Sequence, residues 1–158
     1  MIAQLSPSTA LNTDYQQFLK ALETSGFRGE ISADYASRVV LATDNSIYQR
    51  LPQAAVFPRD ADDVALLARL IAEPAYQKVV ITPRGGGTGT NGQSLTDGIV
   101  VDLSRHMNRI LEINVEQRWV RVQAGVVKDQ LNAALKSAGL FFAPELSTSN
   151  RATVCGMI

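Results

Sequence analysis

A glycine-rich stretch, ITPRGGGTGTNGQ at residues 81–93, limits what this chain can fold into more than any other feature. Its glycines fall at positions 85, 86, 87, 89 and 92. Glycine loses more backbone entropy on folding than any other residue, so a cluster of this density needs a structural or a binding reason. The stretch therefore predicts a specialised loop at the end of the β-branched run KVVIT, residues 78–82.

Several interpretations of the loop can be compared. A Walker loop is excluded because no Gly-Lys-Ser/Thr follows the glycines. Gly87, Gly89 and Gly92 spell the dinucleotide motif GxGxxG, but that motif requires a following helix, and here QSLTDG leads into another strand. A connecting loop without a ligand stays open as an alternative. Successive backbone N–H groups among hydroxyl side chains, with Arg84 at the edge, favour a pyrophosphate cradle.

The segments that open the chain predict helices and a turn-rich connection. Thr13 is expected to be the N-cap of a first helix, with Gln16 completing a capping box and Gly26 ending the helix. A second, short helix is expected to start at Ser32. Residues 42–52 are too rich in turn formers for regular structure and predict a loop.

A βαβ unit is expected to lead into the glycine-rich loop. Apolar runs at 54–58 and 78–82 predict two strands, and Asp60 is expected to cap a helix between them that ends at Ala72. After the loop, the patterns predict a strand at 98–103, a hairpin at 110–115 and 118–125, a helix at 127–139 and a short strand at 140–144. The fold class is therefore α/β (α+β), with a small mixed sheet flanked by helices and the glycine-rich loop at one sheet end.

Composition excludes several classes of function. The 15 basic and 15 acidic side chains among 158 residues cancel, so neither nucleic acid nor a membrane surface is indicated as a partner. The single cysteine, Cys155, excludes an internal disulfide and is typical of a reducing compartment. With one histidine besides, the chain offers too few ligands for a zinc or iron–sulfur site. Because the N-terminus also lacks the pattern of a signal peptide, a cytoplasmic location without a membrane span is expected.

Several segments together resemble a known family. TPRGGGTGTNGQ followed by VDLSRHMNRI resembles the FAD-binding domain of the p-cresol methylhydroxylase and vanillyl-alcohol oxidase superfamily. With VFPRDADDVALLARL, VRVQAGVVKDQLN and FFAPELSTSNRAT, the chain is more closely similar to bacterial FAD- and iron–sulfur-containing D-2-hydroxyacid dehydrogenases, of the D-2-hydroxyglutarate type. The resemblance runs from about residue 12 to the end of the chain.

The resemblance implies a non-covalent FAD site to which two segments of this chain contribute. In the family, backbone amides of the glycine-rich loop wrap the FAD pyrophosphate. This implies, in the loop, Arg84, Gly85, Gly86, Gly87, Thr88, Gly89, Thr90 and Asn91. A later segment lies along the ribityl and flavin side, and here it implies Pro144, Glu145, Ser147, Ser149, Thr153 and Gly156. Ala124 and Gly125 suit either the approach of a flat ring or a tight turn.

The chain also departs from the family in two ways. Cys155 stands where relatives usually have a glycine, and is expected to be a small buried residue rather than a redox nucleophile. The second lobe of the flavin domain, the substrate-binding domain and the iron–sulfur clusters of the family are not found in this sequence. No catalytic residue is therefore expected, and the chain alone is not expected to oxidise the D-2-hydroxyacid to the 2-oxoacid.

The remaining candidates have simple structural interpretations. His106 is expected in an exposed turn, and because the loop carries Thr88 and Thr90 where relatives with covalent flavin have a histidine, no covalent attachment is expected. Trp119 is expected to pack in a strand. The acidic cluster formed by Asp60, Asp62 and Asp63 is explained by helix capping without a metal, and no metal site is expected.

Two hypotheses for the whole chain follow. The expected organisation is a flexible tail at 1–11, a helical segment at 12–50 and, at 51–158, the first lobe of an FAD-binding domain, which looks truncated at CGMI. The first hypothesis is an FAD-binding part of an FAD-linked oxidoreductase. The alternative is a truncated, non-catalytic fold unit that binds no flavin alone and self-associates, or pairs with a partner, through the surface left by the missing lobe.

Overall fold

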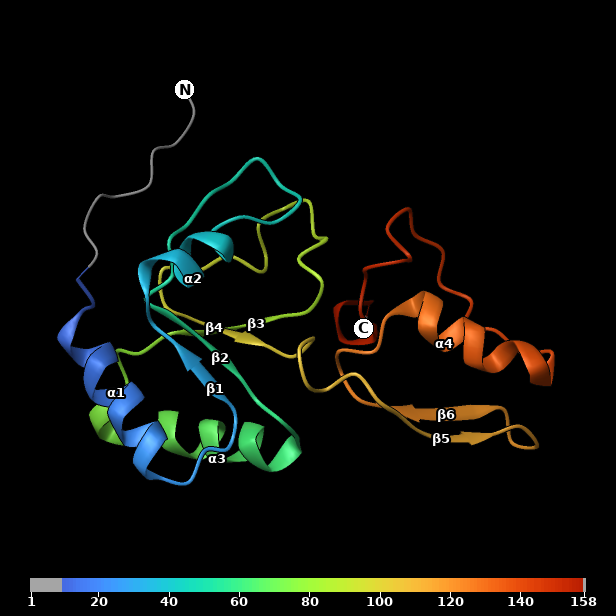
Figure 1. Cartoon of the computed structure of the whole chain (residues 1–158), viewed down its shortest axis with the longest axis horizontal. Coiled ribbons are helices and arrows are strands. Elements are labelled where there is room, and N and C mark those ends of the chain that lie inside the picture. Colours follow the sequence, from blue (N-terminus) through green and yellow to red (C-terminus); the bar gives the residue numbers. More distant parts are fainter. Residues whose placement is uncertain (1–9, 158) are drawn as a thin grey trace.

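A mixed four-stranded sheet forms the first half of the structure, a computed structural model that describes residues 10–157 (Figure 1). The spatial order of its strands is β1-β2-β4-β3. The bounds are β1 Glu30–Ser32, β2 Ala54–Phe57, β3 Ile81–Arg84 and β4 Ile99–Asp102. β2, β4 and β3 run parallel, and β1 joins β2 antiparallel at the edge. The segment that follows β3 is the glycine-rich loop, which therefore lies at the carboxyl end of the parallel strands.

Helices cover both faces of this sheet. α1 (Thr13–Thr24) and α3 (Ala61–Ile71) lie on one face and α2 (Tyr35–Val40) on the other (Figure 1). The larger core lies under α1 and α3, where their apolar stripes meet the inward side chains of the strands. Its buried members are Phe18, Leu19, Leu22, Ala54, Val56, Leu67, Leu70, Val79, Ile99 and Val101. The opposite face is covered more thinly, with Leu41 against Ala55, Phe57 and Val100.

A smaller unit follows in the second half of the chain and lies to one side of the sheet (Figure 1). The hairpin of β5 (Ile110–Asn114) and β6 (Trp119–Val122) packs against α4 (Lys128–Leu135). A core of Val126, Leu131, Leu135 and Val154 joins them. An isolated two-stranded hairpin is marginal in water, so α4 and the C-terminal segment supply the packing that holds it.

The structure confirms the expected fold class and most of its elements. The sheet is small and mixed, β2, α3 and β3 form the βαβ unit, and the hairpin and α4 occur where the patterns predict them. Asp60 caps α3 by accepting from the backbone N–H groups of Asp62 and Asp63. β4 lies between β2 and β3 in the sheet, a neighbour relation that the order of elements along the chain does not specify.

Four local expectations are wrong. The N-cap of α1 is Asn12 rather than Thr13, because the Asn12 side chain accepts from the Asp14 amide. Ser32 belongs to β1, and α2 begins at Tyr35 behind the capping residue Asp34. The strand expected at 78–82 is displaced to Ile81–Arg84, where it pairs with β4. Residues 140–144 are not a strand, since the Asn132 side chain, rather than a neighbouring strand, accepts from the Phe142 amide at 2.7 Å. The tail expected at 1–11 lies outside the described residues except for 10 and 11.

Candidate functional site

The conformation of the glycine-rich loop requires positive φ at only some of its glycine positions. Gly87 and Gly92 have φ of 62° and 73°, in the left-handed region that favours glycine. The Gly87 carbonyl accepts from the Asn45 amide at 3.1 Å, which ties the loop to the 43–45 segment. The 43–45 segment therefore holds the loop in place at Gly87, where the backbone turns.

The backbone N–H groups of this loop are free to bind a ligand. Among the hydrogen bonds of residues 10–157, none is donated by the backbone N–H groups of residues 85–90. Backbone N–H groups in folded proteins almost always find an acceptor, so six successive unpaired donors are open only to solvent or to a ligand. Such a row is the arrangement that binds anions.

A second segment, residues 146–157, packs directly against the loop. A Cβ atom on Gly86 would collide with the Arg151 carbonyl oxygen, and one on Gly85 would collide with the Thr153 hydroxyl. These two glycines are therefore required by the close approach of two chain segments. Backbone bonds from Val154 to Val126 and from Cys155 to Ala124 fix this second segment beside α4.

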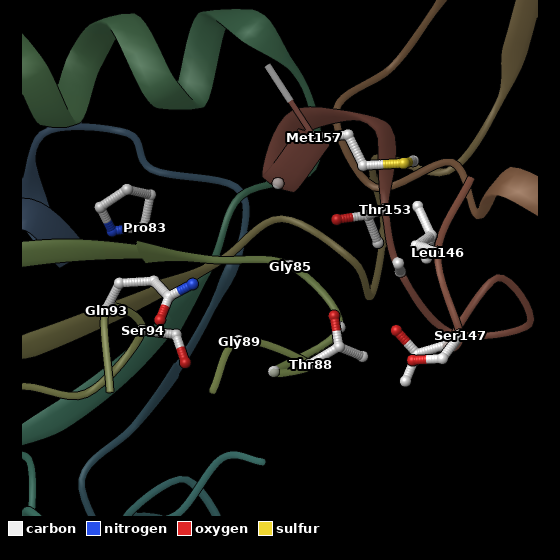
Figure 2. A pocket seen from close by; sticks show the side chains of 15 residues that line it. Pro83, Gly85, Thr88, Gly89, Gln93, Ser94, Leu146, Ser147, Thr153 and Met157 are labelled. Carbon is white, nitrogen blue, oxygen red and sulfur yellow. The ribbon is translucent and has the colours of Figure 1, made fainter. Parts of the chain in front are cut away.

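A hollow of about 350 Å³ lies between the loop and the second segment (Figure 2). Its volume is that of a small ligand site. In Figure 2 Gly85, Thr88 and Gly89 form one side, and Leu146, Ser147, Thr153 and Met157 the other. The full lining is Pro83, Gly85, Gly86, Gly87, Thr88, Gly89, Gln93, Ser94, Leu146, Ser147, Thr148, Ala152, Thr153, Gly156 and Met157. No acidic side chain occurs among these lining residues.

The structure brings together eight of the residues that the sequence singled out. Those that line the hollow are Gly85, Gly86, Gly87, Thr88, Gly89, Ser147, Thr153 and Gly156. Those that do not are Arg84, Thr90, Asn91, Pro144, Glu145 and Ser149. Ala124 and Gly125 also lie outside the lining; a Cβ on Gly125 would strike the Leu103 carbonyl, which favours the tight-turn interpretation. A binding role for each residue stays a prediction.

Seven lining residues were not predicted. They are Pro83, Gln93, Ser94, Leu146, Thr148, Ala152 and Met157. Thr148 and Ala152 each lie next to a predicted residue in the STSNRAT stretch. A prediction that included the whole stretch would therefore have contained them. Gln93 and Ser94 carry no such signal, because the folding-back of the loop is what places them at the hollow.

Arg84 lies behind the loop rather than in the hollow. Its guanidinium donates to the Thr43 carbonyl at 2.9 Å and to the Ser94 hydroxyl at 3.4 Å, and Ser94 in turn donates to Asp44 at 3.0 Å. Desolvation acts to raise the pKa of Asp44, but hydrogen bonds from Ser46 and Ser94, with the charge of Arg84, outweigh it and hold that pKa below its ordinary value. A second, polar hollow of about 230 Å³ opens here, lined by Arg84 and Arg151 among others. Arg84 therefore organises the back of the loop.

The other candidates lie away from the hollow, with one exception. His106 pairs with Glu30 at 2.7 Å, and Asp63 is buried in the first turn of α3. Trp119 is 37% exposed on the hairpin, so its expected packing role is only half fulfilled. Cys155, the exception, has its sulfur 3.4 Å from the hydroxyl of the lining residue Thr153. No group of three potential metal ligands occurs among the described residues.

Comparison with known sequences identifies relatives of this chain. A family model described as FAD binding domain matches residues 52–158. D-2-hydroxyglutarate dehydrogenase of Pseudomonas putida is 80% identical over 158 residues, which is 100% of this chain and 16% of that protein. The chain thus spans a minor part of the length of this curated relative.

Solved structures share the fold at low sequence identity. Alkyldihydroxyacetonephosphate synthase superposes with a TM-score of 0.76 at 20% identity, covering 92% of this chain and 31% of that one. p-Cresol methylhydroxylase with substrate bound gives a TM-score of 0.61 at 15% identity, covering 83% and 26%. These confirm the expected architecture. None of the helices in the described part of the chain is long and apolar enough to cross a membrane.

Proposed function

Since this chain belongs to the family of FAD binding domains, we propose that the hollow between loop 85–89 and residues 146–157 holds the pyrophosphate part of a non-covalently bound FAD. The observation that carries the proposal is the row of six unpaired backbone N–H groups at 85–90. Two phosphates with negative charge need several donors in a concave arrangement, and this row supplies them.

The residues present fit such a group. Thr88, Ser147 and Thr153 add hydroxyl donors around the hollow, and no carboxylate lines it to repel phosphate. Side chains at Gly85 or Gly86 would fill the junction of the two walls. Arg84 and Arg151 lie behind the loop without entering the hollow, and Asp44 in the same lining offsets part of their positive charge. Arg84 accordingly acts here through its hydrogen bonds to the 43–45 segment.

We further propose that the protein to which this domain belongs oxidises a D-2-hydroxyacid of the D-2-hydroxyglutarate type. The proposal rests on the 80% identity to the Pseudomonas putida enzyme. FAD, when bound, would supply the redox chemistry by which a hydride leaves the substrate. This chain's own residues bind and orient the cofactor: the loop amides and hydroxyls hold the phosphates, and Leu146 and Met157 exclude water from one side.

Titration of the 158-residue chain with FAD tests the cofactor site. Binding is followed by quenching of flavin fluorescence and by the rise in melting temperature, which mass action requires of a ligand that binds only the folded state. ADP and FMN serve as partial ligands that separate recognition of the pyrophosphate from recognition of the flavin. Acid precipitation should release all flavin into the supernatant if attachment is non-covalent.

A matched pair of variants shows whether the loop is the phosphate site. Thr88→Glu adds a negative charge at the row of amides, and Thr88→Gln adds the same volume without charge. We expect Thr88→Glu to weaken FAD and ADP binding at least tenfold more than Thr88→Gln, about the 1.4 kcal/mol of one modest charge–charge interaction near a surface. Equal affinities would contradict a phosphate site at the loop.

Self-association is a second proposal, supported by a separate surface. Phe141 is 70% exposed and Trp119 37% exposed, and both line an apolar hollow of about 240 Å³ between β6 and the end of α4. Both charge signs occur on the same hairpin, with Glu112 and Arg121 3.7 Å apart. We propose a second copy as the occupant, because a chain with zero net charge does not repel its copies.

We also propose a cytoplasmic location, on the cysteine usage of the chain. Cys155 is a free thiol in the structure. Free thiols persist in reducing compartments. Fractionation of cells that express the protein, with an antibody against it, is the measurement that checks this location.

A further inference from the structure

Lys128, the first residue of α4, is buried where a cation is unfavourable. Its side chain is 4% exposed. Burial penalises an ammonium group unless it is paired, and the positive end of a helix dipole adds to the penalty at this position. An apolar residue would fit the same space at lower cost, so the charge needs a reason other than packing.

Contacts of Lys128 enclose one wall of the hollow. Its backbone N–H donates to the Ala152 carbonyl at 3.0 Å, and its Nζ lies 3.5 Å from the Glu145 carboxylate. The chain between these two contacts includes Leu146, Ser147 and Thr148, which line the hollow; Leu146 and Ser147 are labelled in Figure 2. One residue of α4 thus holds both ends of this stretch.

The two ends of the stretch are held differently. Residues 148–152 are fixed by backbone bonds, from Asp129 to Ser149 and from Arg151 and Ala152 to the Thr148 carbonyl. In the described part of the chain, no hydrogen bond involves residues 145–147. Their polar attachment to the rest of the molecule is therefore the ion pair between Lys128 and Glu145.

The geometry points to Lys128 as a positioning residue for the cofactor: its ammonium holds Glu145, and thereby sets Leu146 and Ser147 against the hollow. This inference rests on the proposed FAD site. The Glu145 side chain is 86% exposed, so the pair adds little to the stability of the core. What the pair determines is the position of the wall, and with it the affinity for FAD.

The experiment compares Lys128→Met, Lys128→Arg, Glu145→Gln and the double variant Lys128→Met/Glu145→Gln. Lys136→Met, on an exposed lysine just after α4, is the matched control. Two readouts are needed: the FAD dissociation constant from flavin quenching, and the NMR order parameters of the backbone amides of residues 146–148 in the chain without ligand. The second readout does not depend on FAD.

We expect Lys128→Met to raise the FAD dissociation constant about fivefold, the scale of one ion pair, and to lower the order parameters at 146–148. Its melting temperature should not fall, because replacing a buried, poorly paired charge by an apolar residue is neutral or stabilising. Lys128→Arg should retain affinity. Glu145→Gln should match Lys128→Met, and the double variant should add nothing further, since both changes break the same pair.

Unchanged order parameters and unchanged affinity in Glu145→Gln, relative to Lys136→Met, would overturn the inference even if Lys128→Met failed to fold. If the unaltered chain binds no FAD while the order parameters at 146–148 still fall in Glu145→Gln, the positioning role stands and the proposed cofactor site is what fails. The two failures are thereby separated.

Discussion

At the scale of single residues, the glycines of the loop serve different ends. Gly87 and Gly92 supply positive φ, while Gly85 and Gly86 remove side chains where residues 151–153 approach. This division explains why the loop can present its amides: the turns are made at Gly87 and Gly92, and the N–H groups of residues 85–90 have no acceptor among the described residues. Contacts of single side chains elsewhere in the molecule hold the edge strands of the sheet in place.

Glu30 provides a pH-dependent example. Its carboxylate accepts from Arg105 at 2.6 Å and lies 2.7 Å from His106 Nε2. The hydrogen bond from Arg105 is the main cause that holds the pKa of Glu30 below its ordinary 4.5; desolvation opposes it and His106 adds to it. Such a carboxyl stabilises the fold above its unfolded pKa, and this contribution is lost as the pH falls through the folded pKa.

Glu30→Gln should therefore lower the melting temperature at pH 7, and the gap to the unaltered chain should narrow as the pH falls below 4.5, the ordinary pKa of Glu30. Glu23→Gln, an exposed change on α1, is the control. Thermal melts between pH 3 and pH 8 measure both. A gap of the same size at about pH 3 would mean that Glu30 acts through packing rather than charge.

At the scale of elements, the N-termini of α3 and α4 make many of the contacts that connect distant segments of the chain. The first turn of α4 bonds to residues 149 and 152 and so fixes one wall of the hollow. In α3, Asp60 caps the helix, whereas the Asp63 side chain is buried in the protein interior. Asp63 is 2% exposed and accepts from the backbone N–H groups of Arg28 and Arg59 at 3.1 and 2.9 Å.

Asp63→Ala should destabilise the fold by about 2 kcal/mol, because it leaves two partly buried N–H groups without an acceptor. Asp63→Asn, which keeps one acceptor oxygen, should cost less. Asp62→Ala, at a side chain that is 92% exposed, should change little. Urea unfolding of the three variants measures the differences, and equal values for Asp62→Ala and Asp63→Ala would contradict an anchoring role.

At the scale of the whole molecule, the proposed cofactor site lies where the two halves of the structure meet (Figure 1). The loop comes from the sheet half and residues 146–157 from the half with the hairpin and α4. Binding there would draw on both halves, so a ligand should raise the stability of the chain as one unit. The apolar hollow at Trp119 and Phe141 is separate from the proposed cofactor site, since the two share no lining residue.

Phe141→Ser should shift the chain toward monomer if the apolar hollow seats a second copy. Removal of a large exposed apolar side chain at the centre of a contact weakens association by about 2 kcal/mol or more. Ile47→Ser is the control, because Ile47 is 94% exposed and lies outside that hollow. Sedimentation over a range of concentrations measures the association; a monomer at every concentration would exclude self-association.

Sequence alone determined the features that depend on neighbours a few residues apart. The cap at Asp60, the hairpin at 110–122 and the loop at 85–92 follow from local conformational preference, which is why these expectations are confirmed. The same holds for the fold class, because alternating strand and helix patterns leave few architectures. Five loop residues and three of the six expected in the later segment line the hollow, and they were expected from the resemblance to a known family rather than from local preference.

Tertiary structure alone decided the features that join distant parts of the chain. β1 is a strand only because Glu30–Ser32 pairs with β2, and its three residues are too few to show a period. Gln93, Leu146 and Met157 reach the hollow through the approach of two segments some sixty residues apart. The burial of Lys128 and its hold on Glu145 likewise exist only once α4 has docked. Local sequence sets which conformations are available, while packing between remote segments selects their partners.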